Sequence, residues 1–201
     1  MDVTETVEVG AWTLSIVHPP DAEALIEEEA FEREEFLPYW AELWPSALAL
    51  ARTAVTRDLV GLRVVELGCG LALPAVAAAC AGAQVLATDW SADALEYAER
   101  NAAANGVRLA TARVAWAEPH DLVARAPFDL VLAADVLYER RNVPQLLSLL
   151  SELAPEVLLA DPGRPALSAF LEGARERWEI EALRADELPR GAVHRLVRRV
   201  R

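Results

Sequence analysis

The chain has 201 residues, of which 54% are hydrophobic and 25% charged, a composition typical of one globular domain with an ample core. Its formal net charge is −13, which argues against sequence-independent binding to nucleic acid or to an anionic membrane. All 19 of its lysine-plus-arginine positions are arginine, so Schiff-base chemistry and a Walker-type phosphate lysine are excluded.

The cysteines, the histidines and the N-terminus indicate the cellular compartment and whether a metal is expected. Two cysteines, Cys69 and Cys80, suit a reducing cytoplasm better than a disulfide framework. The three histidines show no metal-ligand spacing, so no metal is expected. The acidic N-terminus lacks the features of a signal or transit peptide. We therefore expect a cytoplasmic monomer whose single domain, residues 1–201, has an extension (residues 1–37) ahead of its core (residues 38–201).

The predicted extension has two parts. Residues 3–17 are typical of a small β-hairpin with its turn near VGAW. Residues 21–42 hold nine carboxylates against one arginine and predict an acidic helix. That helix is either a solvated face or a surface that steers a basic, lysine-bearing protein toward the site.

An aromatic cluster follows in residues 38–51, PYWAELWPSALALA. Tyr39, Trp40 and Trp44 come directly before a helix that Pro45 can start. Such a cluster is either simple core or a lid over a bound ligand. We favour the lid, in which Tyr39 and Trp40 contact the substrate.

After Gly61, short aliphatic runs alternate with helical stretches. Five of these runs predict strands, at residues 63–67, 84–88, 108–114, 128–134 and 156–160. Two further runs, at residues 178–183 and 192–200, flank a turn and predict closing strands. Repeated strand–helix units imply a parallel sheet with helices on both faces. We therefore predict an α/β fold with a seven-stranded sheet. Its last strand is antiparallel, and the arginine-rich residues 195–201 form a charged edge strand.

Capping residues predict where three of the helices begin. Ser91 caps a helix that stops at Asn105, and Asn142 caps the next. Pro165 suits the first turn of a third helix, whose apolar face extends to Trp178.

The sequence VVELGCG ends a predicted strand in a carboxylate and then turns on glycine, where open α/β sheets bind ligands. Gly68 and Gly70 allow a ligand close to the backbone, and Cys69 between them is a small packing residue of the same loop. The dinucleotide fingerprint is broken because a leucine stands at its third glycine position. A pyrophosphate would also be repelled by Glu66. S-adenosylmethionine, which carries an ammonium and a sulfonium, is the cofactor that this carboxylate favours.

Three residues further along suit the adenosine part of that cofactor. Asp89 ends the next strand and is placed to bind the two ribose hydroxyls. Trp90 and Trp116 follow successive strand ends, where each either stacks on adenine or packs half-buried. We favour adenine contact for Trp116, and for Trp90 the two interpretations remain equal.

Residues at the ends of two later strands are predicted to face the molecule that accepts the methyl group. The sequence ADVLY places Asp135 and Tyr138 on the loop after the fourth strand. The sequence ADPGRP closes the fifth strand with Asp161 and Arg164, which a bare turn does not need. These two residues are therefore candidates for binding the substrate.

Residues 38–178 resemble the seven-β-strand lysine methyltransferase family, and most of all the branch that methylates the β-subunit of electron transfer flavoprotein. The resemblance rests on PYWAELWP, VVELGCG, the acid at Asp89, ADVLY and, above all, ADPGRP. It implies a class I, Rossmann-like methyltransferase sheet. The cofactor-binding residues that it implies are Glu66, Gly68, Gly70, Asp89, Trp116 and, near the methionine end, Trp44. It also implies that Asp135 and Tyr138 serve the methyl acceptor. The extension, residues 3–35, matches nothing in the family pattern.

The expected reaction is an in-line attack of a neutral amine on the sulfonium methyl, which leaves S-adenosylhomocysteine. A free lysine is about three pH units from its neutral form at pH 7, a cost of about 4 kcal/mol. An aromatic pocket lowers that cost, whereas Asp135 favours the charged form and therefore serves to bind and align the amine. We predict a protein-lysine N-methyltransferase. The alternatives are a small-molecule N-methyltransferase with a nicotinamide-like acceptor and a catalytically silent cofactor-binding module.

Overall fold

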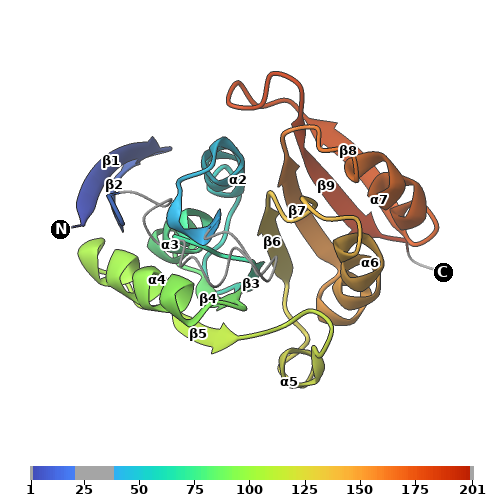
Figure 1. The fold of residues 1–201 in the computed structure, drawn as a ribbon, viewed down its shortest axis with the longest axis horizontal. Helices are drawn as coiled ribbons and strands as arrows, with labels where there is room; N and C mark the ends of the chain where they lie inside the picture. The colour runs from blue at the N-terminus through green and yellow to red at the C-terminus, as the bar shows by residue number, and fades with distance from the viewer. Residues whose placement is uncertain (1, 21–38, 200–201) are drawn as a thin grey trace, which may run out of the picture.

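A computed structural model describes residues 2–20 and 39–199, which form two sheets with helices around the larger one (Figure 1). The larger sheet has seven strands in the order β5-β4-β3-β6-β7-β9-β8. Their bounds are Arg63–Leu67 (β3), Gln84–Asp89 (β4), Ala110–Arg113 (β5), Leu130–Ala134 (β6), Glu156–Asp161 (β7), Trp178–Leu183 (β8) and Ala192–Arg198 (β9). Strands β3 to β7 pair in parallel, and β9 is antiparallel to both of its neighbours, so the predicted seven-stranded α/β sheet is confirmed.

Helices cover both faces of this sheet. They are η2 (Tyr39–Ala41), α2 (Pro45–Ala54), α3 (Leu73–Cys80), α4 (Ala92–Ala104), α5 (His120–Val123), α6 (Asn142–Leu153) and α7 (Leu167–Ala174). In Figure 1, α2, α3 and α4 lie to the left of the sheet and α6 and α7 to the right. None of the helices in the described part of the chain is long and apolar enough to cross a membrane.

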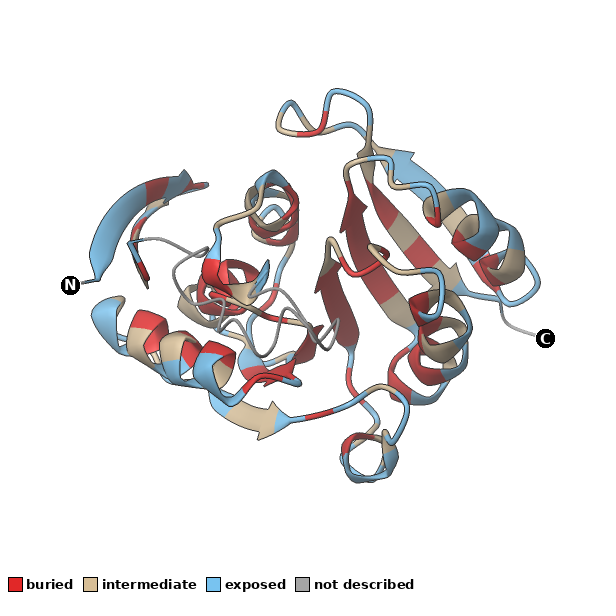
Figure 2. Cartoon of the chain, viewed as in Figure 1, coloured by how far each residue is buried: buried red, intermediate tan, exposed pale blue. Residues whose placement is uncertain are grey.

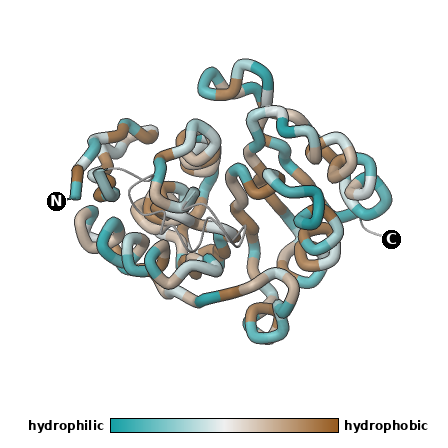
Figure 3. Tube along the Cα trace, viewed as in Figure 1, coloured by the Kyte–Doolittle hydropathy of each residue, from teal (hydrophilic) through white to brown (hydrophobic). Residues whose placement is uncertain are grey.

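Two hydrophobic clusters fill the space between the sheet and these helices. Successive strand residues point to opposite faces, so Val64 belongs to the cluster under α2 and α3, whereas Val65 belongs to the cluster under α6 and α7. Figure 2 shows the buried residues concentrated in the central strands and on the inner sides of the helices. Figure 3 shows the hydrophobic residues in the same places. Both faces of the sheet are therefore buried, as the aliphatic runs of the sequence indicated.

The structure confirms one predicted helix cap and corrects two other features. The Ser91 hydroxyl accepts a hydrogen bond from Ala94 N at 3.4 Å. Asn142 is instead the first residue of α6, and its side chain donates to Val136 O at 2.9 Å. The third helix ends at Ala174, and Trp178 is the fully buried first residue of β8. The prediction that Trp178 lies on that helix was wrong because the chain turns out of the helix before reaching it.

The arginine-rich end is not an edge strand. β9 lies between β7 and β8, so β8 forms the edge of the sheet. Arg195 on β9 pairs with Glu156 of β7 at 2.6 Å and with Glu181 of β8 at 3.7 Å. The charge of Arg195 therefore meets opposite charges on both neighbouring strands, a cross-strand arrangement that favours the inner position.

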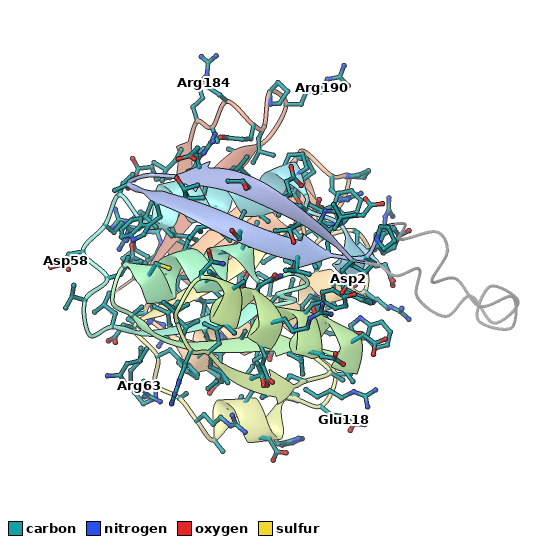
Figure 4. The ribbon with its side chains drawn as sticks, turned by 90° about the vertical axis from the view of Figure 1, so that its left-hand side faces the viewer. Asp2, Asp58, Arg63, Glu118, Arg184 and Arg190 are labelled. Carbon is teal, nitrogen blue, oxygen red and sulfur yellow. The ribbon has the colours of Figure 1, made fainter. Side chains whose placement is uncertain are left out.

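The predicted N-terminal hairpin is confirmed by the antiparallel pair β1 (Val3–Val9) and β2 (Trp12–His18). Leu14 and Ile16 of β2 are buried against α3 and α4. Figure 4 faces this hairpin, which crosses the molecule in front of the helices. The predicted acidic helix, residues 21–42, and its steering role fall mainly on residues 21–38, outside the described residues, and Tyr39–Ala41 near its end form η2.

Candidate functional site

One cavity of about 550 Å³ opens where β3, β4 and β6 end. The order of strands reverses between β3 and β6, which is the place where open α/β sheets bind ligands. All but one of the site residues predicted from the sequence line this cavity: Tyr39, Trp40, Trp44, Glu66, Gly68, Cys69, Gly70, Asp89, Trp90, Trp116, Asp135, Tyr138 and Arg164. The exception is Asp161.

The loop after β3 is shaped by a glycine. Gly68 has a φ of +63°, and a Cβ atom there would lie 3.3 Å from Trp116 Cζ2 and 3.4 Å from Val136 Cγ1. A larger residue would therefore be strained in its backbone and crowded against both side chains. The Trp116 ring reaches this loop from beyond β5, which supports its predicted place beside the cofactor.

Two buried carboxylates stand at the ends of neighbouring strands. Glu66, only 1% exposed, accepts a hydrogen bond from Ala75 N at 2.8 Å, near the start of α3. Asp89 accepts hydrogen bonds from Gly70 N and Ser91 N, both at 3.0 Å. Burial raises the pKa of both carboxyl groups, that of Glu66 well above its usual value. A ligand that brings a cation and hydroxyl donors would compensate this burial, and a second anion would worsen it.

The residues present fit S-adenosylmethionine on these grounds. The cradle at Gly68 would crowd a Cβ atom, and the indole of Trp116 beside it offers a stacking face for a base. The desolvated carboxylates of Glu66 and Asp89 suit an ammonium and ribose hydroxyls respectively. Cys69 is buried, and its thiol pKa is raised, which makes it a packing residue rather than a nucleophile.

Asp135 sits in an uncommon backbone conformation. Its φ is +57°, a region that side-chain-bearing residues adopt in only a few per cent of cases, with aspartate among the more tolerant types. Its amide donates to Ala160 O at 2.9 Å, which ties the loop after β6 to the end of β7. Arg164 Nε donates to Asp135 Oδ1 at 2.5 Å. This rim of the cavity thus contains an ion pair between two residues that the sequence analysis treated separately, Asp135 for the methyl acceptor and Arg164 as a candidate for binding the substrate.

Asp161 builds the turn that carries Arg164. It is fully buried, and its Oδ1 accepts the amides of Gly163 at 2.8 Å and Arg164 at 2.7 Å. The expectation that the turn does not need Asp161 was wrong. A short acidic side chain stabilises such a turn by accepting hydrogen bonds from the backbone amides that follow it. The structure places Asp161 behind Arg164 rather than at the cavity wall, so we assign it to positioning and not to substrate contact.

Aromatic rings from two segments, the cluster at Tyr39 and Trp44 and the loop at Tyr138, meet beside this ion pair. The ring centroids of Tyr39 and Tyr138 are 5.7 Å apart, and those of Tyr39 and Trp44 are 6.2 Å apart. The Arg164 guanidinium lies 6.0 Å from the Trp44 ring. Burial raises the pKa of Tyr138 to about 12, so this phenol stays neutral near physiological pH. Trp40 also lines the cavity but packs on Tyr97 of α4, at 5.3 Å between centroids.

Several lining residues were missed by the reasoning from sequence. They are Glu42, Leu71, Val136, Glu139, Arg141, Asn142 and Gln145. Most of them lie between the end of β6 and the first turns of α6. Asn142 shows why they converge, because its side chain holds the start of α6 to Val136 O. The closeness of Glu139 and Arg141 to Asp135 in sequence was the available signal.

Solved structures share this fold. The *T. thermophilus* 16S rRNA N2 G1207 methyltransferase, in complex with S-adenosylmethionine and guanosine, superposes with a TM-score of 0.70 at 14% identity, over 99% of this chain and 51% of that one. A ribosomal protein L11 methylase from *Lactobacillus delbrueckii* gives a TM-score of 0.60 at 29% identity, over 75% and 77% of the two chains. Fold and site therefore define an enzyme of the S-adenosylmethionine-dependent methyltransferase class.

The family model described as lysine methyltransferase matches residues 38–162. Because that match covers more than half of the chain, the chain belongs to the lysine methyltransferase family. Zebrafish protein N-lysine methyltransferase METTL21A is 32% identical over 79% of this chain and 77% of its own length.

Two relatives from *Xenopus laevis* have different acceptors in their names. The electron transfer flavoprotein beta subunit lysine methyltransferase is 31% identical over 66% of this chain. The histone-arginine methyltransferase METTL23 is 34% identical over 72% of it. This chain spans 55% and 62% of their respective lengths, less than two thirds in each case.

Proposed function

We propose that this protein transfers methyl groups from S-adenosylmethionine to lysine side chains of a protein substrate, with the β-subunit of electron transfer flavoprotein as the first candidate. The observation that carries the proposal is the meeting of Asp135 with the rings of Tyr39, Trp44 and Tyr138 in the same cavity as the cofactor loop. Aromatic faces suit the aliphatic stem of a lysine, and a carboxylate can accept a hydrogen bond from its amine. The similarity to the flavoprotein-modifying relative and the ADPGRP sequence support the choice of substrate.

Each group of residues has its own task in this reaction. Glu66, Asp89 and the loop at Gly68 hold the cofactor, which when bound supplies a methyl group on sulfur and leaves as a thioether that keeps the electron pair of the broken C–S bond. The rings of Tyr39, Trp44 and Tyr138 exclude water from the incoming amine and lower its pKa. Asp135 aligns the amine so that its lone pair forms the new N–C bond. The methylated product then gives up a proton to water before any further transfer.

The test uses a feature of the chain itself. The sequence contains no lysine, so methyl-lysine formed in an assay comes from the substrate and not from automethylation. Purified protein is incubated with methyl-labelled cofactor and either recombinant flavoprotein β-subunit or an extract from a strain that lacks the gene. We expect labelled lysine in a protein band, and less of it with Asp135→Asn.

The other outcomes separate the alternatives. Label on arginine would point to the acceptor named for the histone-arginine relative. Label confined to small molecules would favour the small-molecule N-methyltransferase. A complete lack of transfer by protein that binds the cofactor would favour the silent module.

A further inference from the structure

The carboxylate assigned to the acceptor amine already has a cation beside it. Arg164 Nε contacts Asp135 Oδ1 at 2.5 Å, and the Asp135 side chain is only 8% exposed. The Arg164 side chain remains 33% exposed and lies 6.0 Å from the Trp44 ring. The guanidinium therefore contacts the carboxylate and also lies near Trp44, one of the aromatic rings that line the cavity.

This ion pair is built into the fold from both sides. The amide of Asp135 is bound to Ala160 O, and the amide of Arg164 is bound to the buried Asp161 side chain. Gly191 packs closely against the same turn, because a Cβ atom added to Gly191 would lie 2.0 Å from Asp161 O. A pair between mobile surface side chains contributes little, whereas a pair fixed at both backbones is present before any substrate arrives.

The pairing decides which form of an amine the site favours. An unpaired carboxylate attracts an ammonium and holds its proton, although the ammonium has no lone pair with which to attack. A neighbouring cation has the opposite effect and favours the neutral amine. If the protein balances the charge of Asp135, a larger fraction of the bound acceptor amine is therefore in its reactive neutral form.

We propose that Arg164 neutralises Asp135 so that the site receives the acceptor amine as a neutral base rather than trapping it as an ammonium. This inference rests on the proposed amine acceptor and adds a tuning residue to it. The amine loses its proton to water on entry, and its lone pair then forms the N–C bond. Arg164 acts through Asp135 and takes no proton itself.

The other charged and titratable groups around the pair do not replace Arg164. Arg141 is itself paired with Glu139. Burial raises the pKa of Glu66, Asp89, Asp161 and Tyr138 and lowers that of His194, which faces Asp161 from β9. The remaining titratable groups at the cavity wall are Glu42, Tyr39 and Cys69. Apart from the paired Arg141, each of these groups is an acid or, in the case of His194, disfavoured as a cation by burial.

The first experiment measures binding of a permanent cation, which needs no turnover. Butyltrimethylammonium is titrated into protein saturated with S-adenosylhomocysteine, and its Kd is measured by calorimetry. We expect Arg164→Gln to bind this probe about tenfold more tightly, which corresponds to about one unit in an amine's pKa. Arg164→Lys keeps the charge and should stay within about twofold of the wild type. Arg184→Gln removes an exposed arginine outside the cavity and serves as the matched control (Figure 4).

Equal or weaker probe binding by Arg164→Gln overturns the proposal. If that variant fails to fold, Asp135→Asn decides instead, because asparagine tolerates a positive φ well. It leaves the arginine charge unbalanced, so the probe should bind at least about threefold more weakly. Unchanged binding by Asp135→Asn would then overturn the proposal.

The second experiment uses the pH profile of kcat at saturating lysine acceptor, because kcat reports the ionisations of the enzyme–substrate complex. In Arg164→Gln the unpaired Asp135 raises the pKa of the bound amine, so the acidic limb should move up by about one pH unit. Adding Asp135→Asn to that variant should move the limb back. An unchanged limb contradicts the role of Arg164. Lack of transfer to any amine by the wild type contradicts the proposed function instead, and the probe titration still decides the charge balance.

Discussion

Asn101 on α4 donates a hydrogen bond from its side chain to Leu71 O, at 2.9 Å, in the loop that follows the cofactor glycines. The same fully buried amide accepts from Val17 N at 2.7 Å and donates to Val17 O at 3.1 Å. One side chain therefore joins the N-terminal hairpin to the loop that builds the cofactor site. This contact gives the hairpin, which the family pattern left unexplained, a structural task.

Asn101→Ala should detach the hairpin and loosen this loop. The buried backbone groups left unpaired should lower the free energy of unfolding by about 3 kcal/mol, measured by urea denaturation. The affinity for S-adenosylhomocysteine should fall as well. Asn101→Asp keeps the acceptor for Val17 N but places a buried carboxylate against the carbonyl oxygens of Val17 and Leu71, so near neutral pH it should be at least as destabilising as alanine. Wild-type stability of Asn101→Ala would contradict this role.

Glu66→Gln should change how stability depends on pH. Burial raises the pKa of Glu66, so the folded protein holds this proton more tightly than the unfolded chain does. The free energy of unfolding must then decrease as pH rises from the usual carboxyl value toward the raised one. Glutamine still accepts the Ala75 amide but cannot ionise. We expect the Tm of Glu66→Gln relative to the wild type to increase between about pH 5 and about pH 8. Parallel melting curves would show that Glu66 stays ionised throughout.

Asp89→Ala should weaken cofactor binding before it affects the chemistry. The change removes the acceptor for Gly70 N and Ser91 N and the predicted partner of the ribose hydroxyls. We expect S-adenosylhomocysteine to bind at least about tenfold more weakly by calorimetry. Asp93→Ala, an exposed acid in the first turn of α4, provides the control. Equal affinity in both variants would remove Asp89 from the cofactor site.

Asp135→Asn should have the opposite profile, with turnover reduced by about a hundredfold or more and cofactor affinity retained. The amide can keep the backbone conformation but lacks the charge that aligns the amine. Turnover is measured with the labelled acceptor under saturating cofactor, and affinity by calorimetry. Unchanged turnover would show that Asp135 does not serve the acceptor.

Gly191→Ala should displace the turn that presents Arg164. An added Cβ atom would meet Asp161 O at 2.0 Å, so the backbone there must move. We expect a loss of more than about 2 kcal/mol in unfolding free energy and reduced turnover. Gly106→Ala measures backbone strain without crowding, because Gly106 has a φ of +71° and nothing within 4 Å of the added atom, whereas Gly191 has no positive φ and is limited by crowding alone. A loss no greater than that of Gly106→Ala would show that the turn adjusts freely.

Local patterns in the sequence were sufficient for the sheet and for the cofactor half of the site. The aliphatic runs specify strands buried on both faces, and parallel strands bring their carboxyl ends to one edge. Glu66 and Asp89 each end such a strand, so their closeness follows from strand order alone. The family resemblance supplied the acceptor residues Asp135 and Tyr138, which line the same cavity.

Tertiary structure alone decided how these residues are paired. Asp135 and Arg164 are 29 residues apart and meet because the ends of β6 and β7 are neighbours and Asp161 folds the turn between them. The inner position of β9 likewise depends on pairing with both β7 and β8, which strand propensity does not specify. A sequence records which residues carry charge. Whether a carboxylate in the cavity has a partner depends on long-range backbone geometry, and that geometry decides which form of an amine the site favours.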